Sequence, residues 1–241
     1  MILAGGKCEP ALAEETMVEY RAQVPYLGRS MVEIVLAAVE PLGDPILVGG
    51  PEGMHQRQIE GGASFVESMK RGLAEVKTET FLLVTVDLPC LTTAAVEDFL
   101  NRCDPSVALN YPIISVQDCE REFPGMKRTT LKLKEGEFTG GNLGMMRTDL
   151  MHKALPILEK AYGYRKSPVK LAGLVGFGTL GRILLAKFAP SSLDIPTLEK
   201  KVGSFLGVQV KAIVIPFAEI GADIDNLSQY KSLIALKKPQ Q

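Results

Sequence analysis

Two short stretches of this 241-residue sequence carry residue types that could bind a charged ligand. The first is Gly5-Gly6-Lys7, which follows the apolar residues 1–4, a predicted strand. Glycine lets the main chain approach a ligand closely, and consecutive main-chain N–H groups can point at phosphate oxygens. The lysine would add a positive charge for the same anion. An ordinary turn at a strand end is the alternative interpretation of these glycines.

The second stretch is residues 86–89, Val-Asp-Leu-Pro, at the end of the strongest predicted strand, 81–87. Open α/β sheets bind ligands beyond the carboxyl ends of their strands, where Asp87 would lie. Mg²⁺ prefers one or two carboxylates together with phosphate and water oxygens. Asp87 is therefore a candidate metal ligand, with a helix-capping or turn aspartate as the alternative.

A second carboxylate is expected if a metal binds at Asp87. Asp223 and Asp225 follow the last predicted strand, 208–216, and we expect only one of them to face the site. Asp225 stands just before a predicted terminal helix, so a role as the N-cap of that helix is its alternative interpretation.

The elements that must position these residues alternate between strands and helices through the first two-thirds of the chain. Ser-x-x-Glu capping patterns begin two of the helices, and Thr92 is expected to cap a third. Continuous apolar runs that end at glycine or proline are typical of buried parallel strands. The predicted strands are 1–4, 45–50, 81–87 and 106–115, and the predicted helices are 30–40, 64–76 and 92–103. This order predicts an α/β fold, a three-layer Rossmann-like sandwich with a mostly parallel sheet and helices on both faces.

The pattern changes in the last half of the chain. Alternating residues over 128–142 predict a half-exposed strand and turn, and residues 147–205 predict a helical insertion near the C-terminus. The last strand and the terminal helix complete what we interpret as one domain, residues 1–241.

The composition excludes several classes of partner. Lysine and arginine number 27 and aspartate and glutamate 28, so no broad basic face for nucleic acid or an anionic membrane is expected. Arg182 and Lys187 interrupt the most apolar stretch, which leaves less than the ~20 residues a spanning helix needs. With no secretory leader, no CxxC pair and only two histidines, we expect a cytoplasmic protein with free thiols and no structural zinc.

Residues 176–181, GFGTLG, match the GxGxxG pattern of dinucleotide-binding enzymes, and Asp194 stands near the expected acid. The apolar run before this motif is short and only one strand follows it, which does not favour an oxidoreductase. The apolar block 165–190 that contains it is better interpreted as core or as the contact of a homodimer. The alternative is that this block covers the binding site of a bulky acceptor.

The order of these motifs resembles the nucleotidyltransferases of the GT-A (nucleotide-diphospho-sugar transferase) superfamily. More narrowly, the chain is similar to the molybdenum-cofactor guanylyltransferase-like NTP-transferase group. The similarity runs over nearly the whole chain and rests on LAGG, VPYLGRSMVE after a basic residue, VDLPCLT, TGGN, and IDN before the last helix.

The resemblance implies a set of site residues. The triphosphate would be held by Leu3, Ala4, Gly5, Gly6 and Lys7, and the base would be recognised around Gly62 and Ser68. Mg²⁺ would be held by Asp87 and Asp225, with Asp223 in reserve. The acceptor-side loop would be Gly141 and Asn142.

Two departures from the family pattern concern charge. The glycine loop continues as KCEPALAEE, which lacks the family's arginine, and Arg21 stands where the family usually has a lysine. Arginine keeps the charge and can grip phosphate through two parallel hydrogen bonds, but it is longer and planar.

The activity implied by the resemblance is Mg²⁺-dependent transfer of a nucleoside monophosphate from an NTP to a phosphorylated small molecule, with release of pyrophosphate. Such a reaction requires alignment and charge neutralisation more than a side-chain nucleophile. Arg21, Asp87 and Asp225 would be the catalytic residues. The alternatives are a non-catalytic nucleotide-binding protein and a GT-A-like glycosyltransferase, which would need a nucleotide-sugar donor.

Overall fold

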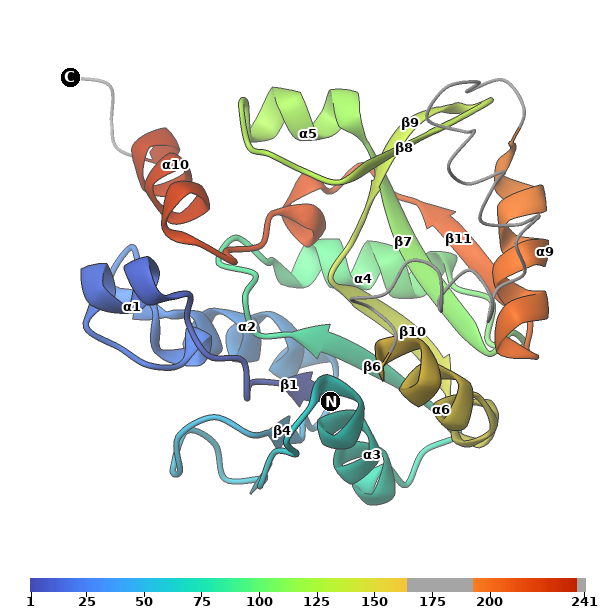
Figure 1. The fold of residues 1–241 in the computed structure, drawn as a ribbon, viewed down its shortest axis with the longest axis horizontal. Helices are drawn as coiled ribbons and strands as arrows, with labels where there is room; N and C mark the ends of the chain where they lie inside the picture. The colour runs from blue at the N-terminus through green and yellow to red at the C-terminus, as the bar shows by residue number, and fades with distance from the viewer. Residues whose placement is uncertain (164–192, 238–241) are drawn as a thin grey trace.

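The computed structural model describes residues 1–163 and 193–237. In this part of the chain nine strands form one mixed sheet in the order β5-β4-β1-β6-β10-β7-β9-β8, with β11 on the other side of β7 (Figure 1). The strands of the sheet are β1 (Ile2–Leu3), β4 (Leu47–Val48), β5 (Gln58–Ile59), β6 (Thr80–Thr85), β7 (Leu109–Ser115), β8 (Thr130–Leu133), β9 (Gly136–Gly140), β10 (Leu143–Arg147) and β11 (Val210–Val214). A separate small hairpin joins β2 (Pro25–Tyr26) to β3 (Arg29–Ser30).

Helices cover both faces of this sheet. They are α1 (Pro10–Thr16), α2 (Met31–Val39), α3 (Phe65–Glu75), α4 (Thr93–Arg102), α5 (Val116–Glu122), α6 (Thr148–Gly163), α9 (Ile195–Leu206) and α10 (Leu227–Lys237). Short 3-10 turns occupy Arg21–Gln23, Glu40–Leu42 and Ala218–Gly221.

The alternation of side chains along each strand explains why two helical layers form. Ile2 and Val84 point to one face and pack in a core with α2 and α4. Leu3 and Leu83 point to the opposite face and pack with α3 and α6. The predicted three-layer α/β sandwich is therefore confirmed, and its strands β5, β4, β1 and β6 run parallel.

The sheet contains strands that the sequence did not reveal, among them the two-residue β5 and the central β10. β10 lies antiparallel between β6 and β7. Its five residues are mostly buried and precede a helix directly, so a short apolar run here could not be told from the first turn of that helix. The stretch 128–142, expected as one strand and a turn, is instead the β8–β9 hairpin, which turns at Lys134-Glu135.

Three of the predicted helices begin at the expected capping residues. Ser30 and Glu33 form a reciprocal capping box at α2, and the hydroxyl of Thr92 caps α4. Ser64 caps α3 as expected, but Glu67 accepts from the N–H of Ala63 instead of Ser64. The helices α1 and α5 are short and were not predicted.

The predicted helical block 147–205 is helical at both of its described ends, in α6 and α9. The motif 176–181 and most of the apolar block 165–190 lie outside the described residues. Asp194, counted above as a candidate dinucleotide acid, caps α9 by accepting from the N–H of Thr197 at 2.9 Å. No helix within residues 1–163 and 193–237 combines the length and apolarity needed to cross a bilayer.

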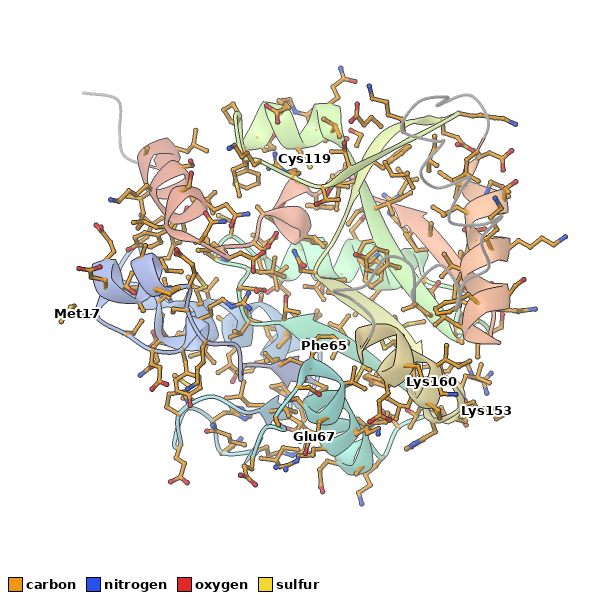
Figure 2. The ribbon with its side chains drawn as sticks, in the orientation of Figure 1. Met17, Phe65, Glu67, Cys119, Lys153 and Lys160 are labelled. Atoms are coloured by element: carbon orange, nitrogen blue, oxygen red, sulfur yellow. The ribbon has the colours of Figure 1, made fainter. Side chains whose placement is uncertain are left out.

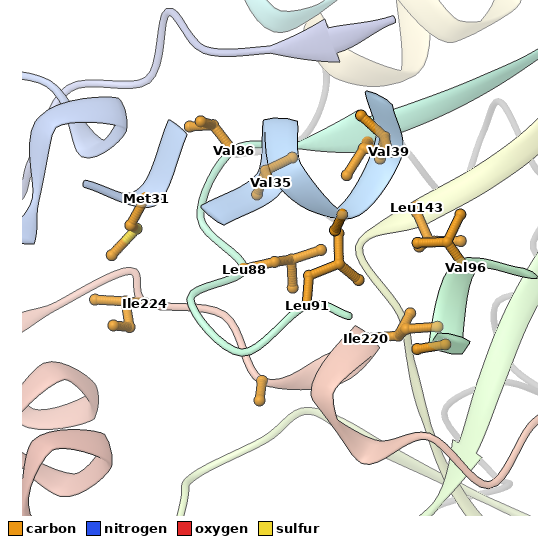
Figure 3. Packing of buried hydrophobic residues seen from close by; sticks show 14 of the residues in the cluster. Met31, Val35, Val39, Val86, Leu88, Leu91, Val96, Leu143, Ile220 and Ile224 are labelled. Atoms are coloured by element: carbon orange, nitrogen blue, oxygen red, sulfur yellow. The ribbon is translucent and has the colours of Figure 1, made fainter. Parts of the chain in front are cut away.

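The core lies directly beneath the carboxyl edge of the sheet. Val86 and Leu88 are buried on either side of Asp87 and pack against α2 (Figure 3). Ile224 packs into the same cluster, and its N–H donates to the main-chain oxygen of Asp87 at 3.0 Å. This packing fixes the backbone around Asp87 and the backbone between Asp223 and Asp225 relative to one another.

Candidate active site

One arginine joins the two acidic residues that were expected to meet. Nη1 of Arg21 lies 2.5 Å from Oδ2 of Asp87 and 2.6 Å from Oδ1 of Asp225. The side chain of Asp87 is 12% exposed and that of Asp225 is 56% exposed, so the group spans from the interior to the mouth of the site. Arg21 is itself held next to the glycine turn, because its main-chain N–H donates to the oxygen of Gly6 at 2.9 Å.

Asp225 is available for this contact because a neighbour takes the capping role. The side chain of Asn226 accepts from the N–H of Gln229 at 3.1 Å at the start of α10. The expectation that Asp225 could be the N-cap of this helix is therefore wrong. Asparagine and aspartate are equally good caps, so the local sequence does not show which of the neighbours Asp225 and Asn226 caps the helix.

Asp223 also faces the site, which corrects the expectation that only one of the two aspartates would. Residues two apart in an extended chain point to the same face, and Ile224 between them is fully buried on the other. Burial and the nearby charges of Asp87 and Asp225 raise the pKa of Asp223 to about 6. Three carboxyl groups thus lie close together, and Arg21 contacts two of them, Asp87 and Asp225.

Asp87 has an oxygen that the protein leaves without a partner. Its Oδ1 is buried and accepts no hydrogen bond within the described residues. Burial raises the pKa of Asp87, while the positive charge of Arg21 opposes that shift. An unpaired buried carboxylate oxygen is costly unless a donor or a cation reaches it.

The acidic residues of the site suit a metal that needs only a few ligands from the protein. Among the residues described, no three His, Cys, Asp or Glu side chains are placed as a complete metal cage. Mg²⁺ does not require such a cage, because it keeps water and phosphate ligands and takes only one or two carboxylates. Asp87 and Asp225 therefore fit Mg²⁺ as an ion shared with a phosphate ligand.

A cavity of about 280 Å³, here called the nucleotide-side cavity, opens beside Arg21 and Asp87. The expected residues that line it are Leu3, Gly5, Gly6, Gly62 and Ser68. The N–H groups of Gly5 and Gly6 have no acceptor within the described part of the chain, as a phosphate-binding turn requires.

Two of the residues expected in this cavity lie elsewhere. Ala4 is completely buried in the core. Lys7 points away from the cavity, where its Nζ pairs with Glu19 at 2.6 Å and lies over the ring of Tyr20. The isolated strand bridge between Lys7 and Tyr20 sets this direction, and no local pattern could have revealed it.

Glycines allow the main chains around the nucleotide-side cavity to approach closely. A Cβ at Gly49, whose φ is +79°, would lie 2.9 Å from the Cα of Gly5. A Cβ at Gly61 would lie 3.0 Å from the Cα of Gly49. Next to them, the hydroxyl oxygen of Ser68 accepts from the N–H of Gly62 at 2.9 Å and holds that loop against α3.

A second and larger cavity of about 710 Å³, the acceptor-side cavity, lies on the other side of the aspartates. Asp223, Asp225, Asn142 and Tyr111 line it. Gly141 does not, because it is buried where a Cβ would meet Ile220 at 2.6 Å. Of the two residues expected in the acceptor loop, only Asn142 therefore reaches the cavity.

The main chain of Asn142 links the two sides of the site. Its oxygen accepts from the N–H of Thr85 on β6 at 3.1 Å. Its N–H donates to the oxygen of Ile220 at 2.9 Å, in the 3-10 turn that leads to Asp223.

Sequence reasoning missed two basic residues of the acceptor-side cavity, Lys127 and Arg128. The signal available was the basic pair that follows a Pro-Gly turn in FPGMKRTT. Nothing in that pattern shows that Arg128 becomes buried, because α5 covers it only in the folded chain.

A hollow of about 920 Å³ lies elsewhere, between α6, α9 and β11. It contains none of the predicted site residues. Figure 2 shows Lys153, which lines this hollow, on α6 and well away from Phe65, which begins α3 and lines the nucleotide-side cavity. The chemistry of the molecule is therefore concentrated at the carboxyl edge of the sheet.

The glycine turn after the first strand and the buried aspartate after the central strand both lie in the part of the chain that matches an NTP-transferase family model. Solved structures share this fold. A hypothetical transferase from Thermus thermophilus is 37% identical, with a TM-score of 0.85 over 95% of this chain and 96% of that one. At 18% identity, the 2-C-methyl-D-erythritol 4-phosphate cytidylyltransferase from the same organism shares the fold, with a TM-score of 0.54 over 98% and 97% of the two chains.

A nucleotidyl transferase from Methanothermobacter shares the same fold at 16% identity, with a TM-score of 0.55 over 97% of this chain and 94% of that one. None of the curated proteins compared matches this sequence. The family model described as the MobA-like NTP transferase domain matches residues 1–124, just over half of the chain. The chain belongs to this family.

Proposed function

We propose that the protein transfers a nucleoside monophosphate from an NTP to a phosphorylated small molecule and releases pyrophosphate, in a Mg²⁺-dependent reaction in the cytoplasm. The observation that carries this proposal is the contact of Arg21 with both Asp87 and Asp225, beside a glycine turn at the carboxyl edge of the sheet. Such an edge is where open α/β sheets bind ligands.

The nucleotide-side cavity supplies what a triphosphate requires. The N–H groups of Gly5 and Gly6 would donate to phosphate oxygens, and the neighbouring guanidinium of Arg21 would neutralise their charge. Lys7 is paired with Glu19 away from the cavity, so Arg21 takes the cationic role alone among the residues that line it. Gly62 and Ser68 would shape the part of the cavity that meets the base.

The acidic side of the site fits a divalent cation. Asp87 and Asp225 would hold Mg²⁺, and the buried Oδ1 of Asp87 is an oxygen that lacks any other partner within the described ranges. When bound, Mg²⁺ supplies charge neutralisation and a template for aligning phosphate groups. Arg21 contacts Oδ2 of Asp87 and Oδ1 of Asp225, so we expect its guanidinium to transfer to the triphosphate when substrates bind.

The chemistry needs no side-chain nucleophile. An oxygen of the acceptor phosphate attacks the α-phosphorus, the bond from that phosphorus to the bridging oxygen breaks, and pyrophosphate leaves with the electron pair. The protein's task is to align the attacking oxygen with the leaving group and to balance charge. Asn142 and Tyr111 in the wall of the acceptor-side cavity would help to orient the acceptor.

The test measures pyrophosphate release with the four common NTPs and candidate acceptor phosphates. Asp87→Asn and Asp225→Asn should each lower the Mg²⁺-dependent rate by at least ~100-fold, because each removes a metal-binding charge. Asp149→Asn is the matched control, since Asp149 pairs with Arg147 on the surface outside both cavities. A double variant of Asp87 and Asp225 that folds and keeps full activity would refute the proposal.

The same assay separates the alternatives. Tight binding of an NTP without turnover would identify a non-catalytic nucleotide-binding protein. Turnover of a nucleotide-sugar without pyrophosphate would identify a glycosyltransferase. A single domain over 1–241 and a homodimer formed through residues 165–190 remain predictions, which limited proteolysis and sedimentation can test.

A further inference from the structure

A buried arginine in the wall of the acceptor-side cavity takes no part in the catalytic centre proposed above. The side chain of Arg128 is only 5% exposed. Its Nη1 donates to the main-chain oxygens of Phe123 at 3.4 Å and Met126 at 3.1 Å. Its Nε and Nη2 are buried and have no hydrogen-bond partner among residues 1–163 and 193–237.

This arrangement leaves a positive charge poorly compensated. A guanidinium stays charged in proteins, and buried donors without acceptors are unfavourable. The nearest carboxylate oxygen is that of Glu120, 3.5 Å from Nη1, on a side chain that is 49% exposed. A partly solvated carboxylate at that distance balances the charge weakly.

Lys127 adds a second charge at the same place. Its side chain lies on the surface and lines the acceptor-side cavity, and it forms no ion pair with any described residue. We call Lys127 and Arg128 the basic wall of this cavity.

The basic wall is separate from the aspartates that line the same cavity. Within the described chain, no ion pair joins Arg128 to an aspartate. The cavity therefore has an acidic side, where the reaction would occur, and a basic side away from it.

We propose that the basic wall binds an anionic group of the acceptor that is distinct from the reacting phosphate. This inference rests on the proposed function, because it assigns the acceptor to this cavity. The acceptor class is then a small molecule with two anionic groups, the reacting phosphate and a second phosphate or carboxylate at its other end.

The chemistry of the two residues suits such a group. Nε and Nη2 form the side of the guanidinium that can donate two parallel hydrogen bonds to a carboxylate or phosphate. Lys127 would add a mobile point charge at the cavity surface. Because Nε and Nη2 are shut off from solvent, we expect the guanidinium to shift towards the cavity when the anion enters.

The experiment titrates the full-length protein with inorganic phosphate and, separately, with acetate, and follows binding by phosphorus NMR and by thermal unfolding. Lys127→Gln and Arg128→Gln should each weaken phosphate binding at least fivefold. Lys132→Gln is the matched control, because Lys132 is an exposed lysine nearby that pairs with Glu137 outside the cavity. Its phosphate affinity should equal that of the wild type.

Unchanged phosphate affinity in both Lys127→Gln and Arg128→Gln overturns the proposal. Arg128→Gln could also disturb folding. In that case the phosphate affinity of Lys127→Gln, a substitution on the surface, tests the proposal by itself. Arg21→Gln distinguishes this inference from the proposed function: phosphate binding that depends on the basic wall but not on Arg21 supports this inference, whereas loss of pyrophosphate release in Arg21→Gln tests the proposed function separately. Competition by acetate would identify a carboxylate as an acceptable second group, and its absence would restrict the group to phosphate.

Discussion

The guanidinium of Arg21 lies across Gly6, so close that a Cβ at Gly6 would come within 3.0 Å of its Nε and 3.1 Å of its Nη2. The glycine turn and the acidic residues are thus connected through one side chain. The absence of a side chain at Gly6 is what allows Arg21 to reach Asp87 and Asp225 from this side.

Gly6→Ala should displace Arg21 from the two aspartates. Contacts this short are avoided in folded proteins, so either the guanidinium or the turn must move. We expect pyrophosphate release to fall at least ~10-fold, since a misplaced charge at a phosphate site costs ~1.4 kcal/mol or more. Gly43→Ala is the control, because a Cβ there meets no atom within 4 Å and the extended backbone suits alanine. Full activity of Gly6→Ala would show that Arg21 need not lie over the turn.

The approach of main chains at Gly49 gives a prediction for stability. Gly49 and Gly53 both have φ near +80°, but only at Gly49 would a Cβ meet another backbone, 2.9 Å from the Cα of Gly5. Alanine in this conformation costs about 1–2 kcal/mol at either position. Gly49→Ala should therefore lower the free energy of unfolding by at least ~1 kcal/mol more than Gly53→Ala in urea denaturation. Equal losses of stability in the two variants would mean that the backbones at Gly49 and Gly5 can move apart without a cost in free energy.

The pKa of Asp223 gives a prediction for pH dependence. Its folded value of about 6 exceeds the ordinary 3.8, so the folded protein binds this proton more tightly than the unfolded chain. The stabilisation is complete below pH ~4 and is lost as the pH rises through 6. Asp223→Asn should thus be more stable than the wild type at pH 7–8, by on the order of 1–3 kcal/mol, and the difference should shrink towards pH 4.

These measurements require a chelator, because a divalent cation would also favour the ionised carboxylates. Asp149→Asn is a control, because its effect on stability should depend on pH in the opposite direction. Arg147 lowers the pKa of Asp149, so its stabilisation is present above the unfolded pKa and is lost as the pH falls. A difference between Asp223→Asn and the wild type that stays constant from pH 4 to 8 would contradict the raised pKa.

Sequence patterns predicted the features for which local residue preferences agree with the overall fold. The capping residues Ser30 and Thr92 and the apolar strand that ends at Asp87 predicted the alternating elements, and the order of the motifs brought Asp225 to the same edge. These features depend on spacing within a few residues or on the fixed order of strand ends in an α/β sheet.

The rest depends on contacts between distant segments. β10 is recognisable only by its partners β6 and β7, and Lys7 is directed by its isolated bridge to Tyr20. The cap of the last helix is Asn226 and not its neighbour Asp225, which the local pattern could not decide because either residue type can cap a helix. Arg128 becomes buried only when α5 packs beside it, so its position could not be inferred from composition or periodicity.

The main chain at Asn142 restricts how this molecule can adapt to its substrates. The N–H of Thr85 donates to the oxygen of Asn142, and the N–H of Asn142 donates to the oxygen of Ile220. These two bonds join the nucleotide half and the acceptor half in the middle of the site. Any hinge opening at this point would break both bonds. We therefore expect the distance between the two halves to change little when substrates bind, and the length of the acceptor to be a main determinant of whether it is used.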